Sequence, residues 1–185
     1  MYKLCKTEQS AVRQRQLEQK LADLMNIHRY EEITVSDFCT YAGIPRKAFY
    51  RYFSSKDGAL YALLDHTMQE YELLREPQSA SGLQDIQMEM EHFFRFWHQQ
   101  KPLLDALELS GISGILMERA IDNVMLFTKD VITRDNPKMR DHVLRFAVCG
   151  LMIMMIDWHH RSYQESISEM SAIALRLLSQ PLFSV

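Results

Sequence analysis

The chain has 185 residues, of which 47% are hydrophobic and 24% are charged, and its formal net charge at pH 7 is −3. This composition excludes bulk disorder, and the length allows one or two compact units. Only 6 glycines and 5 prolines occur and no alternating strand pattern is sustained, so we expect an all-α soluble protein.

The first predicted helix covers about residues 7–27 and follows six residues that we expect to fray. Within it Leu17, Leu21, Leu24 and Met25 recur at i, i+4, i+7 and i+8, which gives the helix one apolar face. We expect this face to support the helices that follow. The basic residues on the same helix fit either an approach to phosphates or a solvated face.

Residues 33–60 carry the pattern around which the chain is organised. A short helix is predicted over 35–42, with Thr34 as its N-cap because the hydroxyl can accept a backbone N–H. Asp37 stands three positions on, where a capping box needs an acceptor. Gly43 stands where a left-handed residue ends a helix, so a tight turn is expected there.

A second helix is predicted to start at Pro45, whose missing N–H has no intrahelical partner in a first turn. Phe49 is expected to face the core, together with Tyr52 and Phe53. The other residues of this helix are expected to point outward, and they combine basic side chains with the small Ala48. Basic side chains donate to guanine acceptors and a small residue permits close approach, which favours reading of the DNA major groove.

The predicted DNA contacts are of two kinds. Residues at the start of the second helix are expected to approach bases, whereas Tyr50 and Arg51 are better placed for phosphates. Lys56, with the free N–H groups at the start of the next helix, is expected to hold a phosphate. The candidate DNA-binding residues are Thr34, Pro45, Arg46, Lys47, Ala48, Tyr50, Arg51 and Lys56.

The rest of the chain is predicted to be helical as well. A long helix over about 56–74 is followed by the clearest breaker cluster, at 76–82. Ser166 and Glu169 form a capping box at the start of the last helix. The helices predicted after the breaker cover about residues 83–100, 102–109, 115–133, 138–161 and 166–179.

This second part of the chain is rich in methionine and aromatic residues. Such side chains adapt to irregular space and suit an apolar ligand pocket, although each one taken alone is also typical of a packed core. The candidate pocket residues are Phe94, Trp97, Leu104, Leu107, Met117, Phe127, Met152 and Met155.

The last two predicted helices favour a homodimer. The run 151–156 is apolar on every side of its helix, so one face can meet the domain core while the other meets a partner chain. A fully buried central helix in a monomer is the alternative.

The charge distribution agrees with a nucleic-acid contact near the N-terminus without requiring one. Residues 1–60 hold 10 Lys or Arg and 7 Asp or Glu, a net charge of +3, and the remaining residues hold 11 and 17, a net charge of −6. Local basic charge matters more than the total for a DNA contact. A solvated helix surface explains this modest asymmetry equally well.

The cysteines and the N-terminus bear on the compartment. Cys5, Cys39 and Cys149 are widely spaced and form no CxxC pair, so neither a disulfide framework nor a zinc site is predicted. No signal-peptide core is present, and the most apolar run, 147–156, is too short to cross a bilayer. We expect a cytoplasmic protein with no membrane partner, metal or cofactor.

Segments of residues 33–57 resemble the DNA-binding domain of the TetR (TetR/AcrR) family of transcriptional regulators. The matching segments are Ile33-Thr34-Val35, Ala42-Gly43-Ile44, Phe49-Tyr50-Arg51-Tyr52-Phe53 and Ser55-Lys56-Asp57. The resemblance implies a three-helix DNA-binding domain over 1–55 and an effector-binding and dimerisation domain over 56–185. It also implies a homodimer that binds a near-palindromic double-stranded operator and is released by a small-molecule effector.

Three positions depart from the family pattern. Lys47 stands where a small residue or glycine is usual, Ala48 where a Thr or Ser hydroxyl often contacts the DNA backbone, and Arg29 where a glycine usually ends the first helix. The operator sequence therefore cannot be carried over from the family.

The resemblance favours a ligand-responsive repressor, because repression is the commoner mode of action in the family. A ligand-dependent activator is the nearest alternative, and a helical ligand-binding or protein-interaction module that has lost DNA binding is another. We do not expect an enzyme, because the sequence has no Ser/His/Asp grouping, metal spacing, phosphate loop or paired-carboxylate pattern.

Overall fold

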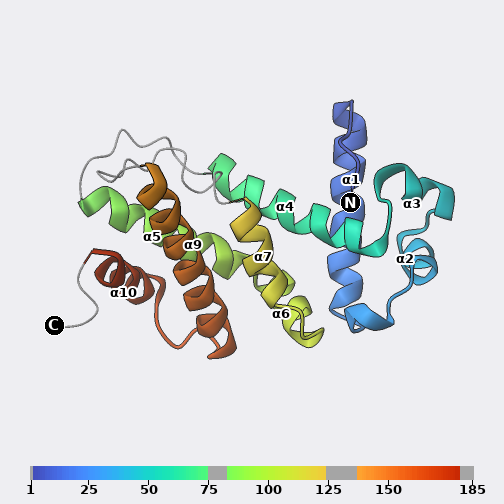
Figure 1. The fold of residues 1–185 in the computed structure, drawn as a ribbon. Helices are drawn as coiled ribbons and strands as arrows, with labels where there is room; N and C mark the ends of the chain where they lie inside the picture. Colours follow the sequence, from blue (N-terminus) through green and yellow to red (C-terminus); the bar gives the residue numbers. More distant parts are fainter. Residues whose placement is uncertain (1, 75–82, 124–136, 180–185) are drawn as a thin grey trace. The chain divides into compact units, whose positions relative to one another are not determined.

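The computed structural model describes residues 2–74, 83–123 and 137–179, and every regular element in these ranges is helical (Figure 1). The elements are α1 (Glu8–Met25), η1 (Tyr30–Glu32), α2 (Val35–Ala42), α3 (Arg46–Tyr52), α4 (Lys56–Leu74), α5 (Leu83–Gln99), α6 (Lys101–Leu109), α7 (Gly114–Asp122), α9 (Pro137–His160) and α10 (Ile167–Ser179). The expected all-α fold is confirmed.

The chain forms two compact units. Unit 1 consists of Met1–Met68 and Pro102–Arg119, and unit 2 consists of Gln69–Lys101 and Ala120–Val185. Helix α4 begins in unit 1 and ends in unit 2, so the backbone passes between the units within one helix. The division at residue 55 inferred from the sequence concerns function and stays a prediction.

The core of unit 1 joins α1 to the two short helices. The four apolar residues predicted to line α1 are all buried, with Met25 at 0% exposure. Phe49 of α3 is 1% exposed and its ring lies edge-on to Phe38 of α2, with 5.4 Å between centroids, while Phe53 follows at 5.3 Å. These rings fix the two helices against each other and leave the opposite face of α3 in solvent.

Most helix ends in unit 1 lie where local sequence signals predicted them, and the exception is the start of α3. The backbone of Gly43 has φ 64° and ψ 38°, the left-handed conformation expected after α2. Pro45, however, is the N-cap of α3 and not its first helical residue, because its ψ of 149° is extended. Its carbonyl accepts the Ala48 N–H at 2.8 Å, which starts the helix at Arg46.

Two further expectations were wrong. Residues 1–6 were expected to fray, but Tyr2 forms a bridge with Phe53 and the Lys3 N–H donates to the Tyr52 carbonyl at 2.9 Å.

The single helix predicted over 115–133 is interrupted, because α7 ends at Asp122 and Asn123 lies in a turn. Asp and Asn side chains compete for backbone hydrogen bonds and favour helix ends. Residues 124–133, and the predicted loop at 76–82, lie outside the described residues.

Unit 2 is built on α5, which packs against α9 and α10. Phe94 and Trp97 of α5 are fully buried, and the Phe94 ring meets Trp158 of α9 at 5.6 Å between centroids. The start of α10 has the predicted capping box: the Ser166 N–H donates to Glu169 Oε2 at 2.8 Å and the Glu169 N–H donates to Ser166 Oγ at 3.3 Å.

Helix α9 is longer than its most apolar run. By length and composition Asp141–His160 is apolar enough to cross a membrane, with a mean hydropathy of 1.2. The expectation that the apolar segment is too short to cross a bilayer was based on residues 147–156 alone and was wrong about its length. A helix in the core or interface of a soluble protein has the same character, and 33% of this segment is buried inside the chain.

Candidate DNA-binding surface

Thr34 positions α2, which together with α3 forms the reader helices, the two helices predicted to read DNA. Its hydroxyl accepts the Asp37 N–H at 3.2 Å, and the Asp37 carboxylate accepts the Thr34 N–H at 2.9 Å and its hydroxyl at 2.6 Å. These hydrogen bonds from Thr34 hold the pKa of the Asp37 carboxyl below its ordinary value. The predicted capping box is confirmed, and it gives partners to two backbone N–H groups at the start of α2.

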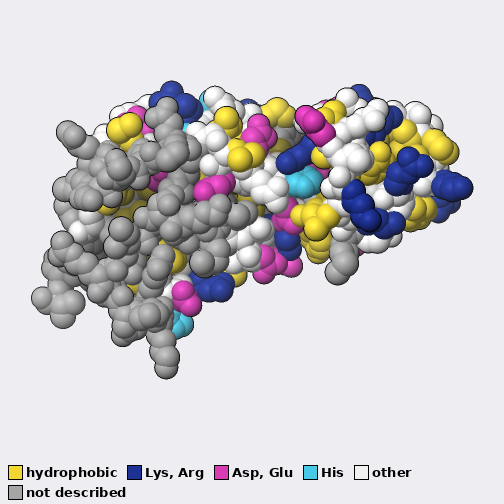
Figure 2. Space-filling view, turned by 90° about the horizontal axis from the view of Figure 1, so that it is seen from above, with side chains coloured by type: hydrophobic (Ala, Val, Ile, Leu, Met, Phe, Trp, Pro, Cys, Tyr) yellow, Lys and Arg dark blue, Asp and Glu magenta, His cyan; other side chains and the backbone are white. Residues whose placement is uncertain are grey.

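Helix α3 presents an exposed basic face. Arg46, Lys47, Tyr50 and Arg51 are exposed and Ala48 is half-buried, as predicted from the pattern of the helix. Buried Phe49 on the opposite side anchors the helix to the core. In Figure 2 the lysines and arginines gather over the end of the molecule that α1, α2 and α3 occupy in Figure 1.

Two of these exposed side chains are coupled. The Tyr50 hydroxyl lies beside the Arg46 guanidinium, one helical turn away, and their hydrogen bond raises the pKa of Arg46. The hydrogen bond joins residues four apart and so holds the Arg46 side chain along α3. An ordered guanidinium near the start of a helix is suited to a bidentate contact with a base edge.

The N-terminal segment supports α3 in a way that the sequence did not reveal. The Lys3 ammonium donates to the Tyr50 carbonyl at 2.8 Å, and the Lys3 backbone N–H donates to the Tyr52 carbonyl. These carbonyls belong to the last turn of a helix, where a cation is favoured by the helix dipole. Lys3 thus ties the end of the exposed helix to the start of the chain.

Lys56 does not point freely into solvent. Its ammonium donates to the Tyr30 carbonyl at 2.6 Å and lies 4.2 Å from the centroid of the Tyr30 ring. The phosphate contact predicted for Lys56 requires the side chain to leave these partners. Its present role is to join the start of α4 to η1.

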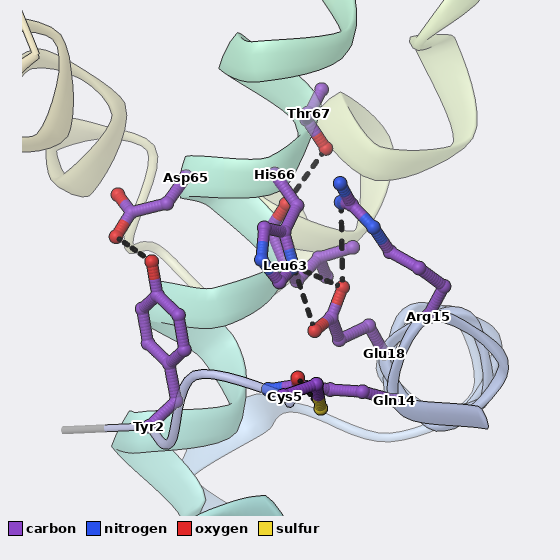
Figure 3. A network of polar contacts seen from close by, with 9 residues as sticks. All are labelled: Tyr2, Cys5, Gln14, Arg15, Glu18, Leu63, Asp65, His66 and Thr67. Carbon is purple, nitrogen blue, oxygen red and sulfur yellow. Dashed lines mark hydrogen bonds and ion pairs between the residues drawn. The ribbon is translucent and has the colours of Figure 1, made fainter. Parts of the chain in front are cut away.

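A buried polar network joins α1, α4 and the N-terminal segment (Figure 3). Glu18 of α1 is 2% exposed, and both of its carboxylate oxygens lie 2.9 Å from His66 Nδ1. The Tyr2 hydroxyl donates to Asp65 Oδ2 at 3.1 Å, and the Tyr2 ring packs edge-on to His66. Burial, with Asp65 adding to it, raises the pKa of Tyr2 to about 12. The network fixes α4 against α1 and against the N-terminal segment.

The buried carboxyl of Glu18 makes stability depend on pH. Burial raises the pKa of Glu18 from 4.5 to about 8, against the opposing effect of Arg15. The folded state thus binds this proton more tightly than the unfolded state. The stabilisation is complete below about pH 4.5 and is lost as the pH rises to about 8, at roughly 1.4 kcal/mol for each pKa unit.

We expect Glu18→Gln, which is neutral at every pH, to lose less stability than the parent protein between pH 5 and pH 8. The free energy of unfolding in urea at several pH values measures this. Glu70→Gln, a change of the same type on the exposed side of α4, should behave as the parent. If Glu18→Gln loses as much stability as the parent over this range, the account of Glu18 is wrong.

The candidate pocket residues are distributed over both units. Leu104, Leu107 and the half-buried Met117 belong to unit 1. Phe94, Trp97, Met152 and Met155 belong to unit 2, where all four are fully buried, and Phe127 lies outside the described residues. The described cavity, with a volume of about 320 Å³, lies in unit 1, and none of the eight lines it. The pocket stays a prediction.

Among the side chains that the structure describes, the polar clusters do not form a metal site. In residues 2–74, 83–123 and 137–179, no three or more His, Cys, Asp or Glu side chains come together in a group that could hold a metal ion.

Solved structures share this fold, although no family model and no curated protein matches the sequence. A TetR-family transcriptional regulator from Streptomyces coelicolor is 17% identical, with a TM-score of 0.59 over 91% of this chain and 79% of its own. The fatty acid degradation regulator FadR from Bacillus halodurans is 13% identical, with a TM-score of 0.67 over 97% and 98%. The dihydroxyacetone kinase operon activator DhaS is 16% identical, with a TM-score of 0.58 over 89% and 93%. The chain therefore has a TetR-like fold.

Proposed function

We propose that this chain, which has a TetR-like fold, is a DNA-binding transcriptional regulator. The observation that carries the proposal is the exposed face of α3. Arg46, Lys47 and Arg51 stand in solvent on a helix that buried Phe49 anchors and that Lys3 caps. A short rigid helix with exposed basic groups and a small Ala48 suits insertion into the major groove.

We infer that the protein acts as a homodimer through α9 and α10. Val143, Phe146 and Ile153 of α9 are 40%, 68% and 56% exposed, and they lie at i, i+3 and i+10 on one stripe. Gly150 lies on the same stripe, and no heavy atom comes within 4 Å of a Cβ built there, so a partner helix can approach closely. On α10 Ile173, Leu177 and Leu178 are also 40% exposed or more. So much exposed apolar surface favours a partner.

The proposed mode of action is repression that a small-molecule effector relieves. An effector releases DNA only if it binds the released state better, and a tenfold preference is worth about 1.4 kcal/mol. The likeness to DhaS, whose name describes an operon activator, supports keeping a ligand-dependent activator as the alternative. We also propose that the protein acts in the cytoplasm and has no catalytic activity.

The salt dependence of DNA binding tests this function. For a true DNA binder, log affinity should fall linearly with log salt concentration, because each neutralised phosphate releases about 0.9 counterion. A dimer has two α3 helices, one from each chain. If each of them contacts about three phosphates, the slope should be about −5. A slope near zero would instead favour the module that has lost DNA binding.

A further inference from the structure

The cavity in unit 1 is small, open and built from elements next to the reader helices. Its walls come from η1, the first turns of α4, the α6–α7 turn and the start of α7. Its volume of about 320 Å³ falls at the lower end of the range for small-molecule sites. Gly111 and Gly114 form part of the wall, and no heavy atom lies within 4 Å of a Cβ built at either. The turn therefore leaves this space unfilled.

The charged groups that line the cavity are acidic. Asp57 and Glu118 both contribute to the wall, and the lining residues include no Lys, Arg or His. Asp57 accepts the Tyr30 hydroxyl at 2.6 Å, so one of its oxygens already has a partner. Within the described part of the chain the exposed Glu118 carboxylate makes no hydrogen bond or ion pair. The wall thus presents negative charge that is only partly compensated.

Lys56 and Arg119, which adjoin the lining residues Asp57 and Glu118 in the sequence, are held by other groups. Lys56 donates to the Tyr30 carbonyl and covers the Tyr30 ring. Arg119 forms a two-pronged ion pair with Asp65, at 2.8 Å from Nε and 2.8 Å from Nη2, and lies over the Tyr61 ring at 5.1 Å. The two lining carboxylates and Asp65 carry three negative charges, and Lys56 and Arg119 carry two positive charges. One negative charge remains, which matches a ligand with a single positive charge.

Two amides near the start of α7 are already engaged and offer little to an anion in this cavity. The N–H groups of Ile115 and Leu116 already donate to the carbonyls of Ile112 and Ser113, at 3.0 Å and 3.1 Å. These amides are therefore not free to bind a phosphate or carboxylate group, as the amides at a helix start otherwise do. The acidic side chains decide the polarity of the cavity.

We propose that this cavity binds a small organic monocation, such as an alkylammonium. Its charged group lies between Asp57 and Glu118, and its apolar part contacts Leu60, Tyr61 and Ile112, which also line the wall. Lys56 and Arg119 already lie over tyrosine rings here, and a bound ammonium makes the same kind of contact. Such a ligand joins the first turn of α4, four residues after α3 ends, to α7. This proposed cation site does not rest on the proposed DNA-binding function.

Choline and its uncharged isostere 3,3-dimethylbutan-1-ol are the probes, and the full chain is titrated without DNA by calorimetry and ligand-detected NMR. Choline should bind and the isostere should bind more weakly. Glu118→Gln removes the unpaired carboxylate and should weaken choline binding by about 1.5-fold to fivefold, the range expected for one exposed charge. Glu70→Gln, on the exposed side of α4, is the matched control and should bind choline as the parent does.

Three results would overturn the site: no choline binding, equal affinity for choline and its isostere, or unchanged choline binding by a folded Glu118→Gln. Circular dichroism and the thermal midpoint establish that the variant is folded. Because DNA is absent from these titrations, the site and the proposed DNA-binding function succeed or fail separately.

Discussion

The double variant Phe146→Glu/Ile153→Glu is expected to be a folded monomer that no longer binds an operator tightly. Both side chains are more than half exposed on α9, so the charges are tolerated in a single chain. In the proposed dimer the same positions face the partner helix, where the two introduced carboxylates from each chain would lose their water and repel one another. Light scattering should give the mass of one chain, and circular dichroism should remain helical.

The loss of operator affinity follows from the loss of the partner chain, which supplies the second DNA-binding α3 helix. Two linked readers bind more tightly than one by a factor that commonly reaches 10² to 10⁴, so we expect a decrease of about 100-fold or more. Ile86→Glu/Met88→Glu adds the same charge at exposed apolar positions of α5 and should remain dimeric and bind DNA. A double variant in α9 that stays dimeric would contradict the interface.

Replacing Arg46 and Arg51 separately by alanine is expected to separate base reading from phosphate binding. Both changes remove one exposed guanidinium from α3, so each is the matched control for the other. Arg46→Ala should relax the preference at particular base pairs and cost about 1–3 kcal/mol at the preferred sequence. Arg51→Ala should weaken binding to all sequences alike and make the salt slope shallower by about 1 for each reader.

Binding to a panel of duplexes with single base-pair changes measures both effects. If the two variants change the sequence preference in the same way, the assignment of Arg46 to bases and Arg51 to phosphates is wrong. Tyr50→Phe is less suitable as a phosphate variant, because the Tyr50 hydroxyl also interacts with the Arg46 guanidinium.

Features that depend on neighbours along the chain were predictable from the sequence. The capping box of Thr34 and Asp37 involves residues three apart, and the left-handed turn at Gly43 needs only the local backbone. Helical spacing likewise placed Phe49 in the core and Arg46 on the surface. Periodicity reports which side of a helix is apolar, so exposed and buried faces follow from it.

Features that depend on distant residues were not predictable. Lys3 meets the carbonyl of Tyr50, 47 positions away, and a basic residue in a short irregular segment gives no periodic signal. Lys56 was expected on a phosphate, whereas the fold supplies the Tyr30 carbonyl as its partner. The burial of Glu18 was equally hidden, because α1 brings an acidic residue onto its buried side where His66 of α4 meets it.

Selection from a pool of random duplex DNA at two salt concentrations tests the central claim most directly. The account predicts that sequencing of the bound fraction gives one two-fold symmetric motif at both concentrations. If adjacent major grooves are used, the half-sites should be about 10 base pairs apart, roughly 34–36 Å. No enriched motif, or binding that vanishes at moderate salt, would contradict a sequence-specific dimeric regulator.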